Sequence, residues 1–117
     1  MKAGNEAKET FVMVLSENKS DLEGMTLKKH HKITRDHMLK KMKNSSASAS
    51  EEVTIDGHSA LQDELRGTQA GINVVFLHTT VEDDENFQQI LAWTTKSRWD
   101  QEKDELQEVT GTFRSEN

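Results

Sequence analysis

The 117-residue sequence contains no cysteine, no proline and no tyrosine, and its only aromatic residues are four Phe and two Trp. Without cysteine, the chain can form no disulfide, no thiolate metal site and no cysteine nucleophile, and its redox compartment cannot be inferred. The longest apolar run, Phe11–Leu15, has five residues, whereas a membrane-spanning helix needs about 20. We therefore expect no transmembrane segment. No charged-then-apolar leader opens the chain, so we expect any signal peptide to have been removed or never to have existed.

Large aliphatic and Phe side chains are also scarce. Leu, Ile, Val and Phe account for 24 of the 117 residues, which is at the edge of the range in which chains stay disordered. The net charge is only −6, however, and the apolar residues are clustered. These properties favour one folded domain over residues 1–117. We expect residues 1–9 to be disordered and the Ser/Ala-rich stretch 44–51 to be a flexible loop.

Short apolar segments bounded by turn residues predict strands at 10–15, 53–55, 59–66, 72–80 and 87–95. Apolar residues recurring at helical steps predict helices at 27–43 and from Ser97 to about Gly111. Thr26 is expected to cap the first helix, and Ser97 with Asp100 to begin the second. The inward stripe of the first helix comprises Leu27, His31, Thr34, Met38 and Met42, and that of the second comprises Trp99, Leu106, Val109 and Phe113.

The predicted strands are apolar on both faces. In 72–80, Phe76 points to one face while Val75 and Leu77 point to the other, and strand 87–95 alternates in the same way. Both faces of such a sheet must be covered, and the two predicted helices are available to cover them. The short connections favour antiparallel pairing. The sequence therefore predicts an α+β fold, a three-layer α/β/α sandwich with an antiparallel sheet.

Charge is unevenly distributed along the chain. Residues 1–50 carry ten basic and six acidic side chains, a net +4, whereas residues 51–117 carry five and fifteen, a net −10. The basic side chains concentrate on the helix predicted at 27–43, which suggests an acidic protein partner, contact with an anionic membrane surface, or simply a solvated face. Nucleic acid is not expected, because this helix has no aromatic residue and the pI is about 5.3. The candidate interaction surface combines helix residues with the first strand: Lys28, Lys29, Lys32, Arg35, Lys40, Phe11 and Met13.

The sequence contains no local pattern that indicates catalysis or metal binding. No two of the five histidines are three or four residues apart on one helix face. His31 is expected on the packing stripe and the others in solvent, and the acidic run 82–85 is read as a solvated hairpin tip because it lacks the spacing and glycine of a calcium loop. Phosphate loops and nucleophile motifs do not occur. We expect no catalytic residue, cofactor or bound metal.

Four segments together resemble the PsbP-like family, whose relatives include DcrB-like lipoproteins, the Ran-binding Mog protein and the Eag-type secretion chaperones. They are Val53–Ala60 (VTIDGHSA), Val75–Thr79, Gln89–Trp93 and Gly111–Phe113. The resemblance runs from about Phe11 to Phe113 and implies an α/β/α sandwich without shared catalytic residues. Such domains usually begin with an extra strand that ends in an aromatic-Pro-x-x-Trp-like segment. Only ten residues precede Phe11 and the chain has no proline, so we expect that first strand to be missing.

The resemblance and the residues together suggest a non-enzymatic protein-binding or assembly module of the chaperone type. The alternative is a small-ligand binder or an enzyme that uses a pocket between the sheet and a helix. With its first strand missing, the sheet would expose the edge of strand 10–15, and we expect that edge to pair with another protein or with a second copy in a homodimer. The sequence does not distinguish between two locations, the bacterial envelope or periplasm and the cytoplasm.

Overall fold

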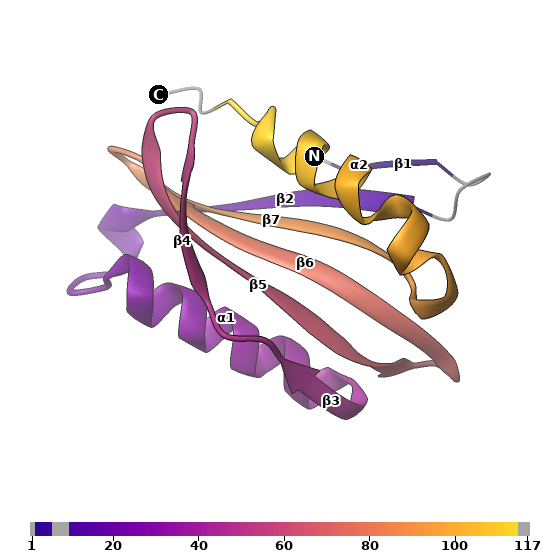
Figure 1. The fold of residues 1–117 in the computed structure, drawn as a ribbon. Coiled ribbons are helices and arrows are strands. Elements are labelled where there is room, and N and C mark those ends of the chain that lie inside the picture. Colours follow the sequence, from indigo (N-terminus) through magenta and orange to yellow (C-terminus); the bar gives the residue numbers. More distant parts are fainter. Residues whose placement is uncertain (1, 6–9, 115–117) are drawn as a thin grey trace.

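The computed structural model describes residues 2–5 and 10–114, and side chains from residue 10 onward. These residues form one antiparallel sheet of seven strands with a helix on each side (Figure 1). The sheet order is β1-β2-β7-β6-β5-β3, and β4 also pairs with β5. The strands are β1 (Lys2–Asn5), β2 (Thr10–Asn18), β3 (Lys43–Ala47), β4 (Glu51–Ile55), β5 (His58–Gln69), β6 (Ile72–Glu82) and β7 (Asn86–Thr95). The helices are α1 (Leu27–Lys41) and α2 (Trp99–Gly111), with short 3-10 turns at Lys19–Asp21 and Lys96–Arg98.

The two helices cover opposite faces of the sheet, which confirms the predicted three-layer arrangement (Figure 1). On the face under α2, Val75, Leu77 and Ala92 pack against Trp99 and Leu106. A second cluster on this face contains Ile55, Ala60, Val81 and Ile90, with Phe113 packed against it. On the face under α1, the apolar cluster consists of Met42, Leu65, Phe76 and Leu91. The alternation predicted for strands 72–80 and 87–95 therefore placed Val75, Leu77, Ile90 and Ala92 on one face and Phe76 and Leu91 on the other, as the structure has them.

Most residues of each predicted helix stripe are buried or half-buried, and the structure corrects three details of the prediction. Thr26 caps α1 by accepting a hydrogen bond from the Lys29 backbone N–H at 3.2 Å. α1 ends at Lys41, because Met42 takes an extended backbone conformation. α2 begins after Arg98 without a side-chain cap, so the capping role expected for Ser97 is wrong. Its buried residues are Trp99, Glu102, Leu106 and Thr110, while Val109 remains 41% exposed.

The N-terminal segment differs from the prediction. β1 pairs with β2 along residues 10–13, with Lys2 opposite Met13 and Asn5 opposite Thr10. The expectation that strand 10–15 forms the open edge of the sheet is therefore wrong along these residues, and so is the premise of a homodimer formed there. Disorder is wrong for residues 2–5, which form a strand; residues 1 and 6–9 lie outside the described residues.

The Ser/Ala stretch expected to be a loop over 44–51 is largely a strand. β3 runs from Lys43 to Ala47 and pairs with residues 65–68 of β5, and β4 begins at Glu51. The Ser48 backbone N–H also donates to the Glu64 carbonyl O at 2.9 Å. Low side-chain complexity did not prevent pairing, because β5 offers a free backbone edge and backbone hydrogen bonds require no particular side chain.

Gly67 allows the C-terminal end of α1 to approach the sheet closely. A Cβ at this position would lie 2.8 Å from the Met42 Cβ and 3.3 Å from the Lys43 carbonyl O. Only glycine leaves room for this contact. Gly67 is thus a packing position on β5, which extends beyond the predicted end at residue 66, and the turn itself is confined to Ala70 and Gly71, which have φ of 51° and 79°.

Candidate functional site

A cluster of buried polar side chains lies between the N-terminal half of α1 and the sheet. His31 comes from α1, Asp63 from β5 and His78 from β6, and these residues are 2%, 3% and 0% exposed. The His31 Nε2 lies 2.9 Å from the Asp63 Oδ2, and the His78 Nδ1 lies 3.1 Å from the Asp63 Oδ1. The two imidazole rings stack with their centroids 4.4 Å apart. One carboxylate thus joins two histidines across three elements.

Further hydroxyl and amide groups surround this cluster. Ser50 Oγ donates to the Asp63 Oδ2 at 2.9 Å. The outer nitrogen of His31, Nδ1, lies 2.7 Å from Thr80 Oγ1. The outer nitrogen of His78, Nε2, lies 3.1 Å from Thr34 Oγ1 and 3.2 Å from Gln89 Nε2. Every nitrogen of the two rings therefore has a polar neighbour, as burial requires.

The environment of the cluster favours an ionised Asp63 and a neutral His78. Burial alone would raise the pKa of Asp63, but the hydrogen bonds from His31 and His78 outweigh it and hold that pKa well below its usual range. Burial lowers the pKa of His78 despite its hydrogen bond to Asp63. An ionised carboxylate only accepts hydrogen bonds. His31 must therefore donate through Nε2–H and His78 through Nδ1–H, which leaves the outer nitrogen of the neutral His78 as an acceptor.

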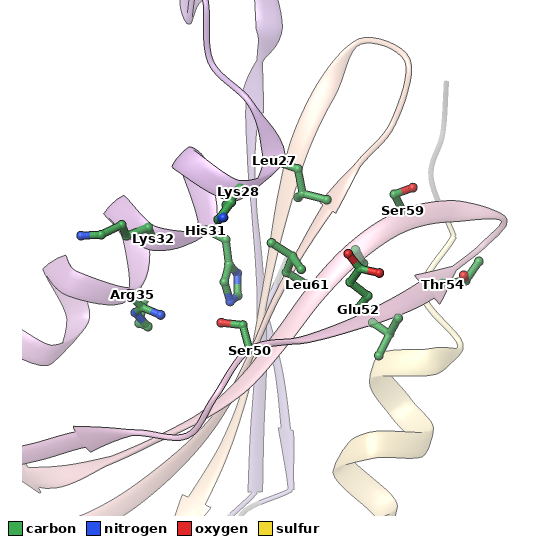
Figure 2. Close-up of a pocket in the computed structure, with 12 residues that line it drawn as sticks. Leu27, Lys28, His31, Lys32, Arg35, Ser50, Glu52, Thr54, Ser59 and Leu61 are labelled. Atoms are coloured by element: carbon green, nitrogen blue, oxygen red, sulfur yellow. The ribbon is translucent and has the colours of Figure 1, made fainter.

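A cavity of about 920 Å³ opens beside this cluster, between α1 and the β4–β5 hairpin (Figure 2). Its α1 wall carries Lys28, Lys32 and Arg35, and its sheet wall carries Glu52 and the hydroxyls of Thr54 and Ser59. Lys32 is paired with Asp36 at 2.7 Å, and Arg35 lies 3.4 Å from the same carboxylate. Figure 2 shows His31 hanging from α1 into this space with Ser50 close to its ring. The cavity therefore gives solvent a route to the buried cluster.

A second hollow, about 540 Å³, lies between the C-terminal half of α1 and strands β2, β7 and β6. Its lining is mostly apolar, and Leu15 and Ile33 expose 47% and 55% of their surface there. The other apolar residues that line it are Met13, Met38, Met42, Phe76, Leu91 and Trp93. His37 and Lys41 also line it, and no Asp or Glu occurs among its described lining residues. We call this hollow the apolar groove.

The residues of the predicted interaction surface divide between these two places. Lys28, Lys32 and Arg35 lie together at the 920 Å³ cavity. Met13 lines the apolar groove, and Phe11 stacks on Trp93 at its end with ring centroids 5.5 Å apart. Lys29 and Lys40 are exposed on α1 and line neither hollow. The basic helix and the first strand thus contribute to one face of the molecule but not to a single patch.

The positions expected for the histidines need correction. His31 lies on the packing stripe as predicted, and His37 is exposed, but His30 and His78 are buried rather than in solvent. His30 stacks on Phe87 with centroids 4.8 Å apart and contacts Glu17 Oε1 at 3.0 Å. Asp83 of the acidic turn is also buried, and its Oδ1 accepts hydrogen bonds from the backbone N–H groups of Glu85 and Asn86.

Local spacing in the sequence does not indicate the polar cluster, because its three residues come from three separate elements. The available signal was strand alternation: Asp63 lies between Leu61 and Leu65 on one face of its strand, and His78 lies two residues from Phe76. Both positions face the same side as those apolar residues. Reading the polar members of each inward row would have placed Asp63 on the face of Leu65 and His78 on the face of Phe76, without showing which helix covers them.

Neither the protein-family profiles nor the curated proteins contain a match to this chain. Solved structures do match it. A Pseudomonas aeruginosa protein of unknown function, PA94, described as a putative regulator, gives a TM-score of 0.72 at 9% identity over 92% of this chain and 74% of that one. LpqN of Mycobacterium tuberculosis, described as involved in cell envelope biogenesis, gives 0.66 at 14% identity over 89% of this chain and 61% of its own.

The cyanobacterial PsbP protein (CyanoP) of Synechocystis sp. PCC 6803 gives a TM-score of 0.64 at 15% identity. The alignment covers 91% of this chain and 67% of that one. Identities this low establish the fold alone. In the part of the chain that the structure describes, no helix is long and apolar enough to cross a membrane. With its antiparallel sheet and a helix on each face, the chain has a PsbP-like fold.

Proposed function

We propose that this protein is a non-enzymatic binding module that holds an apolar segment of another protein in the apolar groove. The observation that carries this proposal is the exposure of Leu15 and Ile33 at the mouth of a groove lined by three methionines. Methionine side chains are flexible and polarisable, so they adapt to apolar partners of different shape. A groove between a helix and a sheet suits a segment that inserts its side chains in a row.

The charges around the groove indicate which apolar segment would bind. Lys41 and His37 are part of its lining, and α1 carries further exposed cations at Lys29 and Lys40. Charges of opposite sign on the two partners favour encounter and set orientation. The expected occupant is therefore an apolar segment flanked by acidic residues, belonging to another protein.

A peptide-binding experiment tests this proposal. The probes are two labelled synthetic peptides with the same apolar centre, one flanked by Asp and Glu and the other by Lys, and binding is followed by fluorescence anisotropy. We expect the acidic-flanked peptide to bind more tightly by about tenfold or more at low salt, with the difference shrinking as salt is added. Equal affinity for the two peptides, or no binding of either, contradicts the proposal.

Two matched variants locate the binding surface. Ile33→Asp places a negative charge at the groove, whereas Val109→Asp makes the same change at an exposed apolar residue of α2 on the other face. We expect Ile33→Asp to weaken binding by at least about tenfold and Val109→Asp to leave it unchanged. If the two variants weaken binding equally, the groove is not the binding site. Binding of a small apolar dye with no peptide binding would favour the small-ligand alternative.

A further inference from the structure

We propose that His31, Asp63 and His78 form a binding site for a divalent transition metal, with Zn²⁺ as the ion that fits best. Each residue offers one ligand atom, and the three atoms lie within 4.8 Å of one another. Two imidazole nitrogens and one carboxylate oxygen are a ligand set suited to zinc, which takes three protein ligands and one exchangeable ligand in open sites. The inference is independent of the apolar groove, which lies along the other half of α1.

Each histidine nitrogen already lies near a carboxylate oxygen of Asp63 at about the spacing that two zinc ligands require, and the three ligand atoms together lie within 4.8 Å. Zinc bonds of about 2.0–2.1 Å at tetrahedral angles separate neighbouring ligand atoms by about 3.3 Å. The carboxylate oxygens of Asp63 already lie 2.9 Å from the His31 Nε2 and 3.1 Å from the His78 Nδ1. The ion would replace the two N–H protons that now bridge these atoms. The three ligands come from a helix and two central strands, so their positions are set by packed elements rather than by a loop.

The outer hydrogen-bond partners allow this exchange. A metal bound at His31 Nε2 and His78 Nδ1 requires the ring protons on the opposite nitrogens, where a neighbour must accept them. Thr80 Oγ1 lies 2.7 Å from His31 Nδ1, and Thr34 Oγ1 lies 3.1 Å from His78 Nε2. Thr34 Oγ1 also donates to the His30 carbonyl O at 2.9 Å, which leaves its lone pairs free to accept from His78. Hydroxyls both donate and accept, so Thr80 and Thr34 suit either tautomer. The Gln89 side-chain amide, whose Nε2 lies 3.2 Å from His78 Nε2, would turn its oxygen toward the new ring N–H.

The 920 Å³ cavity supplies the entry path and the fourth position. Ser50 is exposed on the segment between β3 and β4, and its Oγ lies 2.9 Å from the Asp63 Oδ2. A water molecule entering from the cavity, or the Ser50 hydroxyl itself, would complete four-coordination. The nearby cations do not forbid a dication, because Asp36 pairs with Lys32 and Arg35, and Glu52 adds a negative charge on the opposite wall.

The ring tautomers of the wild-type protein provide a test that needs no variant. In chelator-treated protein, long-range ¹H–¹⁵N spectra should show His31 protonated at Nε2 and His78 at Nδ1. On addition of one equivalent of Zn²⁺, we expect both rings to switch to the opposite tautomer, with a rise in the thermal midpoint. Unchanged tautomers of both rings at saturating Zn²⁺ overturn the proposal.

Co²⁺ and three variants provide the second test. The wild-type protein should bind one equivalent of Co²⁺ with the intense visible absorption of a four-coordinate site. We expect Asp63→Asn and His78→Gln to weaken Zn²⁺ binding at least about 100-fold, while His37→Gln, which changes an exposed histidine of the same helix, leaves it unchanged. Stoichiometric binding that survives in both cluster variants, or is lost in His37→Gln, places the ion elsewhere and overturns the proposal.

Discussion

The side of the sheet covered by α2 is packed mainly by two apolar clusters, with the buried hydroxyls of Thr79 and Thr94 among them, whereas the side covered by α1 is half polar and half apolar. Under α2, Val75, Leu77 and Ala92 meet Trp99 and Leu106 in contacts that have no directional requirement. Under α1, Met42 and Phe76 form such contacts at one end, but His31, Asp63 and His78 occupy the other. Hydrogen bonds fix distance and angle, so the polar half determines where α1 sits on the sheet more sharply than burial alone does.

The two faces also differ in how much they contribute to stability and to candidate binding sites. Buried apolar area under α2 stabilises the fold, and a third hollow of about 560 Å³ opens on this face beside Val109 and Phe113. Under α1, the 920 Å³ cavity and the apolar groove form where the helix does not fill the space above the strands. The candidate metal site and the apolar groove therefore lie on the same face, at opposite ends of one helix. The packing of α2 on the opposite face stabilises the strands that carry both candidate sites.

Truncating a core side chain on each face should give the largest effect. Phe76 and Leu77 are neighbours on β6 that point to opposite faces and are 7% and 2% exposed. We expect Phe76→Ala to lower the free energy of unfolding by about 3–5 kcal/mol and Leu77→Ala by about 2–5 kcal/mol, measured by urea denaturation. A loss below about 0.5 kcal/mol at either position would mean that the face in question is not a packed layer.

Asp63→Leu should be nearly as costly, because it leaves the ring N–H groups of His31 and His78 buried without an acceptor. We expect a loss of about 3 kcal/mol in metal-free protein. Replacing all three residues of the cluster by Leu should restore part of that loss, because the two ring N–H groups are then removed, while the buried Thr80 and Gln89 lose a partner. If the triple variant is less stable than Asp63→Leu, the cost is cavity or strain and not lost hydrogen bonding.

Two glycine substitutions, one beside the end of each helix, compare how closely other atoms approach the backbone there. Gly67→Ala brings a Cβ to 2.8 Å from the Met42 Cβ, so we expect it to destabilise the protein by about 1–3 kcal/mol. Gly111→Ala meets nothing within 4 Å at the end of α2, and alanine favours helix over glycine. The second change should be neutral or stabilising by up to about 1 kcal/mol. Similar losses in both variants would argue against the close approach of α1 to β5.

Acidification should lower the free energy of unfolding through the polar cluster under α1, by less than the destabilising substitutions described above. The lowered pKa of His78, which faces Asp63, His31 and Arg35, means that the unfolded chain takes up a proton below about pH 6.5 that the folded chain does not. Stability is therefore complete above that pH and falls below it. Below about pH 4, the lowered pKa of Asp63 acts in the same direction, because its carboxyl is protonated only on unfolding.

Urea midpoints of metal-free protein at about pH 7.5 and about pH 5.5 measure this effect, which we expect to be about 1 kcal/mol. His78→Gln should flatten the pH dependence, whereas Leu77→Ala should lower stability at both pH values and leave the difference unchanged. A wild-type protein as stable at the lower pH as at the higher would contradict the buried, neutral state of His78.

Much of the architecture was predictable because it follows from local patterns. Alternation in 72–80 and 87–95 placed Phe76, Leu77 and Trp93 on their faces, and Thr26 marked the start of α1. The two-residue turn at Asp56–Gly57 is formed by residue types that tolerate positive φ, whereas the positive φ of Ala70 is not indicated by its residue type. The weak elements were not predictable. β1 and β3 are strands because β2 and β5 present free edges to them, which no pattern within Lys2–Asn5 or Lys43–Ala47 indicates.

The sequence alone determined which side chains face inward, because helices and strands have fixed periods of 3.6 and 2 residues. It could not determine which inward side chains meet. His31, Asp63 and His78 are separated by 32 and 15 positions and share no local spacing. They converge because antiparallel pairing sets Asp63 opposite His78 and because α1 crosses above both. Contacts between distant segments depend on strand register and helix placement, and the packing of the whole chain decides both.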